Sequence, residues 1–536
     1  MNEQQGAERL GDGYLESCGG SGELLEHWRV LMESVEGLGD EERKRRMESV
    51  RRVIAEQGIT YNVYGDPLGM ERLWNLDMVP MLLGSAEWRN LERGLVQRAT
   101  LLDGVLRDCY GEQRLLKEGY LPPALLFAQS DFLRPVHGIK PSNGRYLNVY
   151  AADVARSPDG QWWVISDRTQ IPTGMGYALA NRLVTARMLP EAFRESGVER
   201  LAGFYQKFQG AMRELVPVGR GGGRVVILTP GPYNETYFEQ AYLARYLGYA
   251  LVEGQDLTVK DGQVFLKTLS GLEPVDVILR RVDDAFCDPL ELRSDSMLGV
   301  AGLLDAVRSG TVGVANMLGS GIVQSPAFRG FLPGLCRAVL GEELAMPSLA
   351  TWWCGQESAE RYVVEHLDDL DICSAFGGGR EVRGKSAAEV REMIRFAPYR
   401  WVGQERMRLS VAPSWEGSGW VEKAVVLRVF LVGTRDGYVV MPGALARTGA
   451  GAVTTGVTMQ DGGASKDTWV LSEGPVNEVT LLSGTTEMVE LRRVGNNLPS
   501  RLADNFFWIG RYAERVDAAA RLSLIHISEP TRPERI

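Results

Sequence analysis

Residues 145–167, RYLNVYAADVARSPDGQWWVISD, consist of two apolar runs joined by a Ser-Pro-Asp-Gly turn, which predicts a β-hairpin. Asp153 lies on the first expected strand and Asp167 ends the second. A carboxylate in such a strand is costly unless a cation or a hydrogen-bond donor meets it. If Asp153 and Asp167 face the same side, they form a two-carboxylate metal site. The alternative is a solvated Asp153 and an Asp167 that caps the turn before Pro172.

The middle of the chain alternates further strands with helical patterns. The run RVVILTP (224–230), an amphipathic helix and VEGQDL predict a parallel strand–helix–strand unit. Residues 257–269 predict a hairpin that turns at Asp261-Gly262, whereas LATWWCGQ (349–356) is expected to be irregular. The fold class indicated is therefore α/β (α+β), with antiparallel hairpins.

The two ends of the chain differ from this middle part. Residues 1–20 are expected to be a disordered leader, and 21–135 a helical N-terminal domain, with helical patterns at 23–57 and 86–119. Residues 498–522 predict one amphipathic helix that needs further helices to cover its apolar stripe. The last stretch, 523–536, continues no periodicity and is expected to be a non-native tail.

Composition excludes several classes of protein. The formal net charge of −10, from 59 basic and 69 acidic residues, argues against a nucleic-acid binder or a membrane-surface protein. The six cysteines form no CxxC pair, which indicates reduced thiols rather than disulfides or a zinc site. No apolar window is long enough to span a membrane, and the N-terminus has no signal-peptide pattern, so a cytoplasmic location is expected.

Several blocks of the sequence match a known family in the right order. The chain resembles the circularly permuted type 2 ATP-grasp proteins that carry a C-terminal alpha-E domain, here truncated after its first helix. The matching segments are YNVYGDP (61–67), RPVHGI (134–139), DRTQIPTGMGYALANR (167–182), GPYNETYFEQAYLARYLG (231–248), RRVDDAFCDPLELRSDSMLGVAGLLDA (280–306), GGASKDTWVL (462–471) and SRLADNFFWIGRYAERVDAAARL (500–522).

This resemblance implies a permuted ATP-grasp core at 136–497 and the first alpha-E helix at 498–522. Because permutation splits one lobe, residues 145–182 and 420–470 should share a sheet. ATP-grasp enzymes hold ATP and Mg²⁺ between two lobes and phosphorylate a carboxylate, and an amine then attacks the acyl phosphate. The implied activity is a carboxylate–amine ligase with small-molecule or peptide substrates. A protein partner is expected at the alpha-E domain, and neither nucleic acid nor a membrane is expected.

The resemblance and the residue chemistry together nominate site residues. Metal ligands are expected at Asp153 and Asp167. Cationic groups near the reacting phosphate and carboxylate are expected at Arg168, Arg280 and Arg281. Residues expected to contact the nucleotide are Arg428, Gln404, Glu405, Gly378 and Lys466, the last in an expected Gly-Gly-Ala-Ser-Lys-Asp loop (462–467). Arg168 has a second interpretation, in which it neutralises Asp167 as a structural ion pair.

Some positions depart from the family pattern. Ser166-Asp167-Arg168 stands where many relatives read Glu-Asp-Asn, and a guanidinium cannot coordinate Mg²⁺. Pro326 and Cys373 stand where relatives carry lysines. These departures favour an alternative function, a non-catalytic scaffold that binds a nucleotide or a peptide. A third interpretation is an enzyme that binds a carboxylate through Arg168 without a metal.

Overall fold

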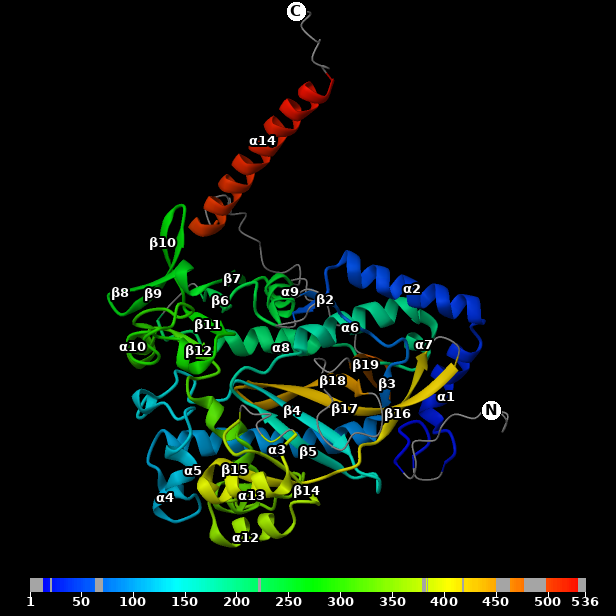
Figure 1. Ribbon diagram of the computed structural model, residues 1–536, viewed down its shortest axis with the longest axis vertical. Helices are drawn as coiled ribbons and strands as arrows, with labels where there is room; N and C mark the ends of the chain where they lie inside the picture. Colours follow the sequence, from blue (N-terminus) through cyan, green and yellow to red (C-terminus); the bar gives the residue numbers. More distant parts are fainter. Residues whose placement is uncertain are drawn as a thin grey trace, which may run out of the picture.

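The central layer of the molecule is a seven-stranded sheet. The computed structural model describes residues 13–19, 22–62, 71–219, 223–377, 382, 384–416, 419–449, 463–476 and 498–528 (Figure 1). The order of the sheet is β3-β19-β18-β17-β4-β5, with β16 also paired to β17. Its strands are β3 (Met81–Leu83), β4 (Val149–Arg156), β5 (Trp162–Arg168), β16 (Val411–Glu416), β17 (Gly419–Thr434), β18 (Gly437–Gly449) and β19 (Ala464–Val470).

This sheet joins segments that are far apart in the sequence. The hairpin expected at 145–167 forms as β4 and β5, and β4 pairs antiparallel with β17. The prediction that 145–182 and 420–470 share a sheet is therefore confirmed. Every residue of β4 is buried, because helices cover both faces of the sheet.

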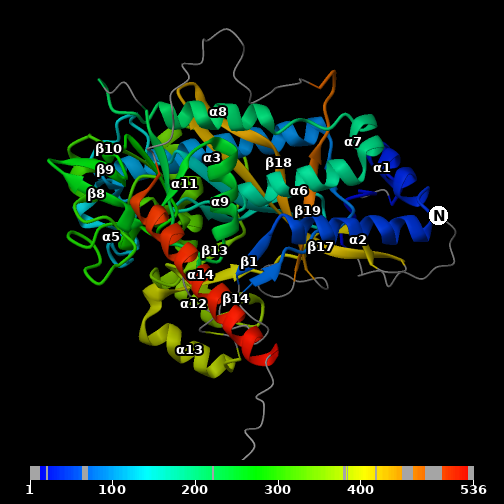
Figure 2. The same cartoon turned by 90° about the horizontal axis from the view of Figure 1, so that it is seen from above.

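Three long helices form these covering layers. Helix α3 (Ser85–Cys109) lies on one face, and α6 (Met175–Met188) and α8 (Ala202–Arg213) lie on the other (Figure 1). Figure 2 shows α6 and α8 over the sheet when the molecule is viewed from above. The two faces of the sheet therefore meet different helices, which separates the environments of neighbouring residues on one strand.

A parallel sheet of order β12-β11-β6-β7 lies beside the central sheet. Its strands are β6 (Val225–Leu228), β7 (Ala250–Val252), β11 (Val277–Arg280) and β12 (Gly313–Ala315). Helix α9 (Tyr237–Leu247) connects β6 to β7, which confirms the predicted strand–helix–strand unit. A small antiparallel sheet follows, with β8 (Leu257–Lys260), β9 (Gln263–Thr268) and β10 (Gly271–Pro274). The predicted Asp261-Gly262 turn forms between β8 and β9 with positive φ angles of 51° and 69°.

A third unit is an antiparallel sheet of order β13-β15-β14. It contains β13 (Thr351–Trp353), β14 (Leu370–Ser374), β15 (Trp401–Glu405), α12 (Glu357–Glu365) and α13 (Ala387–Phe396), with an apolar cluster of its own. The prediction of irregular structure for 349–356 is wrong at β13. That strand is short and pairs with β15, which lies far along the sequence, so no local pattern reveals it.

The N-terminal helical segment shares the core of the central sheet. Its helices are α1 (Glu26–Glu36), α2 (Asp40–Glu56), α3, α4 (Arg114–Lys117) and α5 (Pro123–Phe127), and it also contains the pair β1 (Thr60–Asn62) and β2 (Glu71–Leu73). Strand β3 of this segment pairs in parallel with β19. Within the expected leader, residues 13–19 contact β16 through a bridge from Leu15 to Val411, so this part is not a free tail.

The remaining short helices connect these units. The α-helices are α7 (Pro190–Glu195), α10 (Leu303–Arg308) and α11 (Leu332–Leu340). The 3₁₀ helices are η1 (Arg134–Val136), η2 (Gly254–Asp256), η3 (Asp284–Phe286), η4 (Ser320–Gln324), η5 (Pro326–Phe331) and η6 (Pro398–Arg400).

The last helix, α14 (Ser500–Ser528), projects away from the rest of the described fold (Figure 1). Its start is fixed by Arg501, which donates two 2.8 Å hydrogen bonds to Asp256. Large apolar side chains stand exposed along it: Phe506, Phe507, Trp508, Ile509, Tyr512, Val516, Leu522 and Leu524. The helix predicted at 498–522 is confirmed, but it continues to Ser528, so the expected break in the helical pattern at 523 does not occur. Over the described ranges, no helix is both long and apolar enough to cross a membrane.

Candidate functional site

The carboxylate of Asp153 is surrounded by three arginines from three strands. Arg428 of β17 donates two hydrogen bonds to it, of 2.7 and 3.0 Å, and Arg447 of β18 donates one of 2.7 Å. Arg168 of β5 donates through two nitrogens at 3.3 Å, and the Ser166 hydroxyl donates at 2.7 Å. One buried negative charge therefore faces three positive charges.

The register of the sheet produces this cluster. Asp153 pairs directly with Arg428 on one side and with Ser166 on the other, so all three side chains lie on the same face. Burial alone would raise the pKa of Asp153, but Arg428, Arg447 and Arg168 hold it well below its usual range. Burial and the neighbouring guanidiniums lower the pKa of Arg447 to about 10, against the attraction of Asp153. The cluster therefore carries more positive charge than Asp153 balances.

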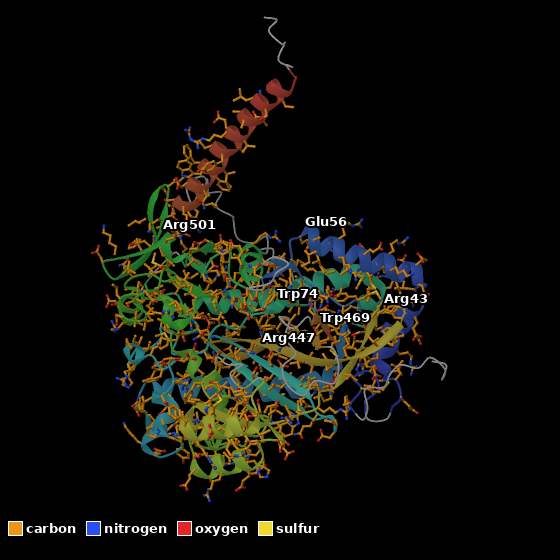
Figure 3. All side chains as sticks on the ribbon, in the orientation of Figure 1. Arg43, Glu56, Trp74, Arg447, Trp469 and Arg501 are labelled. Atoms are coloured by element: carbon orange, nitrogen blue, oxygen red, sulfur yellow. The ribbon has the colours of Figure 1, made fainter. Side chains whose placement is uncertain are left out.

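A cavity of about 470 Å³ opens over the three arginines. Arg168, Arg428 and Arg447 line it, and two acidic side chains, Glu235 and Asp283, line it as well. The other lining residues are Tyr61, Trp74, Gln170, Ile171, Thr173, Gly174, Tyr177, Thr236, Gln324 and Leu445. Figure 3 labels Trp74 and Arg447, which lie near the centre of the molecule.

An aromatic wall borders the cavity. Trp74 and Tyr177 are stacked with ring centroids 4.0 Å apart, and Tyr61 lies 6.4 Å from Trp74. The Trp74 indole donates to Asn181 at 2.9 Å, and the Tyr177 hydroxyl donates to the Thr60 carbonyl at 2.8 Å. These bonds hold the rings in place, so the wall is preorganised.

The loop before α6 is held by a buried acid and a buried arginine. Glu239 accepts hydrogen bonds from the backbone N–H groups of Gly174, at 2.7 Å, and Gly176, at 3.1 Å. Arg281 donates to the Pro172 carbonyl at 2.6 Å. Gly174 has a φ of 114°, and a Cβ there would lie 2.9 Å from a methyl group of Leu445. The loop therefore requires glycine at this position.

Asp167 lies on the opposite face of the same hairpin. Arg98 of α3 donates two 2.7 Å hydrogen bonds to it, and the Tyr150 hydroxyl donates one of 2.6 Å. Burial would raise the pKa of Asp167, but Arg98 and Tyr150 lower it below the usual value. The structural ion pair considered for Asp167 exists, but its partner is Arg98, whereas Arg168 contacts Asp153.

A β-bulge separates the two carboxylates. Val154 pairs with Val164, whereas Asp153 pairs with Ser166, so one extra residue stands in β5. If the register of the Val154–Val164 pair continued, Asp153 would pair with Ile165 and share a face with Asp167, but the shift of one position turns Asp167 to the other side. The expected two-carboxylate metal site therefore does not form.

Magnesium does not fit the residues that surround Asp153 and Asp167. Each carboxylate is occupied by guanidinium or hydroxyl donors, and an arginine never coordinates a metal ion. In the part of the chain that the structure describes, no group of three or more His, Cys, Asp or Glu residues could hold a metal ion.

The other predicted arginines lie away from the cavity lining. Arg280 is buried, forms an ion pair with Asp284, and donates to the Asn316 carbonyl at 2.8 Å. Arg281 is also buried and contacts the loop before α6. Both side chains therefore support loops around the cavity. Their predicted contact with the reacting groups has no basis in this arrangement.

Lys466 is not placed to meet a phosphate. It lies on β19 rather than in a loop, and its ammonium donates to Asp77 at 2.7 Å and to the carbonyls of Val79 and Pro413 at 2.9 and 2.8 Å. The side chain is completely buried. The predicted contact with nucleotide at Lys466 is therefore wrong, because all three of its N–H donors are used inside the core.

Gln404 and Glu405 end β15, in the small sheet at residues 351–405. Gln404 is buried, and its side-chain nitrogen has no hydrogen-bond partner, whereas Glu405 is exposed. Neither lines the arginine cavity, and their contact with nucleotide stays a prediction. Gly378 lies outside the described residues.

The sequence interpretation missed Arg447 and Arg98. Arg98 carries a readable signal, because it occupies the apolar stripe of a helix together with Leu91, Leu95 and Leu102. A cation on such a stripe requires a buried anion. Arg447 lies near the end of an apolar strand, and only its register with β17, together with the long-range pairing of β17 with β4, places it beside Asp153.

The structure defines a mixed α/β fold with a cationic cavity over its main sheet. The model of the circularly permuted ATP-grasp type 2 family matches residues 80–449. The chain belongs to this family. A second family model, described as a predicted alpha-helical domain with a conserved ER motif (Alpha-E), matches residues 498–529. The family resemblance read from the sequence is therefore confirmed.

Similar proteins extend this comparison. The chain is 36% identical over 532 residues to the uncharacterized protein Rv2567 of Mycobacterium tuberculosis, covering 96% of this chain but 60% of that protein. It is 36% identical over 431 residues to the uncharacterized protein sll0335 of Synechocystis, covering 79% of this chain and 90% of that protein. The chain thus spans about 60% of the length of the mycobacterial relative.

Among solved structures, the fold is similar to that of a glutathione synthetase-like effector from Globodera pallida in its apo form. The TM-score is 0.51 at 12% identity, and the match covers 80% of this chain and 96% of that chain. This likeness concerns the fold alone and agrees with the match to the ATP-grasp family model.

Proposed function

We propose that this chain is the catalytic part of an ATP-dependent carboxylate–amine ligase, and that the arginine cavity holds the negatively charged reacting groups. One observation supports the proposal: Arg168, Arg428 and Arg447 converge on the buried carboxylate of Asp153 and line one cavity. Joining a carboxylate to an amine through an acyl phosphate gathers several negative charges, which fixed cations stabilise in a water-poor cavity.

The residues of the chain have distinct tasks in this proposal. Arg428 and Arg447 form the floor, since their side chains are largely buried and Asp153 fixes their direction. Arg168 is 46% exposed and is free to turn toward an anion above it. ATP supplies the phosphoryl group when it is bound. The stacked pair Trp74 and Tyr177 gives a flat ring or an apolar part of a ligand a surface beside the floor.

The alternative function is a scaffold that binds a nucleotide or a peptide without catalysis. The saturation of Asp153 and Asp167 by arginines favours it, because neither carboxylate is left to hold a metal or to accept a proton. Both functions use the same cavity. They differ in whether bound ATP is consumed.

The test is an assay for ADP and phosphate release from ATP in the presence of mixed amino acids or short peptides and an amine. Release that depends on both a carboxylate and an amine, and that falls in Arg447→Gln but not in Arg187→Gln, is the expected result. Arg187 is an exposed arginine on α6 that does not line the cavity. Tight ATP binding without turnover would select the nucleotide-binding scaffold, and no binding of ATP would reject the ligase and leave only a peptide-binding scaffold.

A further inference from the structure

The carboxylate of Asp153, which lies buried behind the three arginines that line the cavity, is already saturated. Asp153 accepts hydrogen bonds from Arg428, Arg447, Arg168 and Ser166, which together use both of its oxygens. A metal ion would have to displace at least one guanidinium and would then sit between like charges. At separations of a few ångströms, the repulsion between the metal ion and the arginines exceeds the attraction that one carboxylate provides.

The guanidiniums can themselves bind and neutralise an anion, as a metal ion would. The three arginines approach Asp153 from different strands, and Arg168 remains substantially exposed to the cavity. Guanidinium forks match phosphate oxygens in geometry and keep their charge without a metal. Arg447 also has a buried Nε with no hydrogen-bond partner, so the floor holds unused donor capacity.

We infer that the cavity binds a phosphate chain directly through Arg168, Arg428 and Arg447, with no divalent metal between the anion and Asp153. The inference rests on the proposed function in one respect, namely that the anion is a phosphate chain. Asp153 then acts as a positioning residue that aims the arginines and does not touch the ligand.

The remaining acids of the cavity define the competing possibility. Glu235 and Asp283 line the same cavity and carry carboxylates. A metal held by these two side chains and the phosphate chain would restore a metal requirement without involving Asp153. Glu235→Gln and Asp283→Asn therefore belong in the test.

The experiment is titration calorimetry of the full chain with inorganic tripolyphosphate and with ATP, each in EDTA and in excess Mg²⁺. Both ligands should bind in EDTA, and Mg²⁺ should leave the affinity within about threefold or weaken it, because it neutralises the anion that the arginines recognise. Arg168→Gln should weaken binding about tenfold or more, and Arg168→Lys should restore part of the loss.

Two matched carboxylate variants distinguish a positioning role from a metal ligand. Asp153→Asn should weaken binding by the same factor in EDTA and in Mg²⁺, because the arginines lose the carboxylate that aims them, whereas loss of a metal ligand would weaken binding only in Mg²⁺. Asp167→Asn is the control, since it makes the same chemical change on the opposite face of the same hairpin. Glu235→Gln and Asp283→Asn should not create or remove any Mg²⁺ dependence.

Each outcome decides between the two ideas. Binding of both ligands only with Mg²⁺ would overturn the inference and leave the proposed function intact. Binding of tripolyphosphate in EDTA without binding of ATP would support the inference and reject the proposed function. Failure of both anions to bind under either condition would overturn both the inference and the proposed ligase function. Melting curves of each variant confirm that a lost signal is not lost folding.

Discussion

The guanidinium of Arg98 donates two hydrogen bonds of 2.7 Å to the carboxylate of Asp167, and both side chains are essentially excluded from solvent. This pair joins α3 to β5 on the face of the sheet that lies opposite the arginine cavity. Removal of one partner leaves a buried charge without compensation. The pair is therefore structural, and its loss should lower the free energy of unfolding rather than the ligand affinity.

Asp167→Asn should lower the free energy of unfolding by about 3–5 kcal/mol and leave anion affinity unchanged. Urea denaturation and calorimetry measure the two quantities. The double change Arg98→Met with Asp167→Leu should recover part of the stability, since no charge then stays buried. A loss of ATP affinity at unchanged stability would instead show that Asp167 takes part in ligand binding.

The depressed pKa of Asp167 also fixes the sign of a pH effect. A carboxyl whose folded pKa lies below its unfolded value of about 3.9 contributes stability that is complete above that value. The contribution is lost as pH falls through the folded pKa. Wild type should therefore lose stability below about pH 4, and Asp167→Asn, which lacks the carboxyl, should lose less over the same range.

Asp131 predicts a pH effect of the opposite sign. Burial raises its pKa to about 6, and Asp284 and Asp283 add to the shift. Its folded form binds a proton more tightly than its unfolded form, so stability falls as pH rises from about 4 to about 6. Asp131→Asn should be more stable than wild type by about 1–3 kcal/mol at pH 7.5 and equal to it near pH 4. A gain that is the same at both pH values would show that charge is not its cause.

Lys466 should behave as a core residue. Lys466→Met leaves Asp77 and the carbonyls of Val79 and Pro413 without their donor. We expect a loss of about 3–5 kcal/mol in unfolding free energy and no change in the affinity of folded protein for ATP. The exposed Lys44 offers a control, since Lys44→Met should change neither quantity. Weaker ATP binding at normal stability in Lys466→Met would contradict this assignment.

The local parts of the fold were predictable from the sequence, and the faces of the strands were not. The Ser157–Gly160 turn and the apolar runs beside it predict the hairpin of β4 and β5 because turn chemistry is local. The bulge opposite Asp153 and Val154 places the extra residue Ile165 in β5, and no pattern in the sequence marks it. That single residue decides whether Asp153 and Asp167 meet or separate.

The candidate site was predictable only in part for the same reason. Asp153, Arg168 and Arg428 were expected in one site, and the structure brings them together. Their relation is an arginine cluster rather than a metal site, because the cross-strand register places Arg428 directly opposite Asp153. Lys466 looked like part of a glycine-rich loop, and its strand is revealed only by its pairing with β18.

The exposed helix α14 predicts a truncation result. Its contact with the rest of the described fold includes Arg501, which binds Asp256 and lies near Glu253. Deletion of 498–536 should change the melting temperature by less than about 4 °C, since few buried contacts are lost, and should reduce self-association by removing the apolar stripe. Size-exclusion chromatography and thermal melts measure both effects. A drop of more than about 8 °C would show that the helix is part of the core.

Arg168 and Arg428 contact the same carboxylate and should nevertheless respond differently to the same substitution. Arg428 is largely buried, donates twice to Asp153, and also donates to the Thr173 carbonyl at 3.0 Å. Arg168 has only the two longer 3.3 Å bonds, and its side chain is 46% exposed.

Arg428→Gln should therefore lower both stability, by about 2–4 kcal/mol, and anion affinity, because Asp153 and the loop before α6 lose a shared anchor. Arg168→Gln should lower affinity about tenfold and change stability by less than about 1 kcal/mol, as expected for a partly exposed ion pair. Raising the salt concentration from 0.05 to about 0.5 M should weaken anion binding in wild type more than in Arg168→Gln, because one recognising charge is already missing. Equal stability losses in the two variants would show that Arg168 is a structural partner of Asp153 and does not turn toward the cavity to bind the anion.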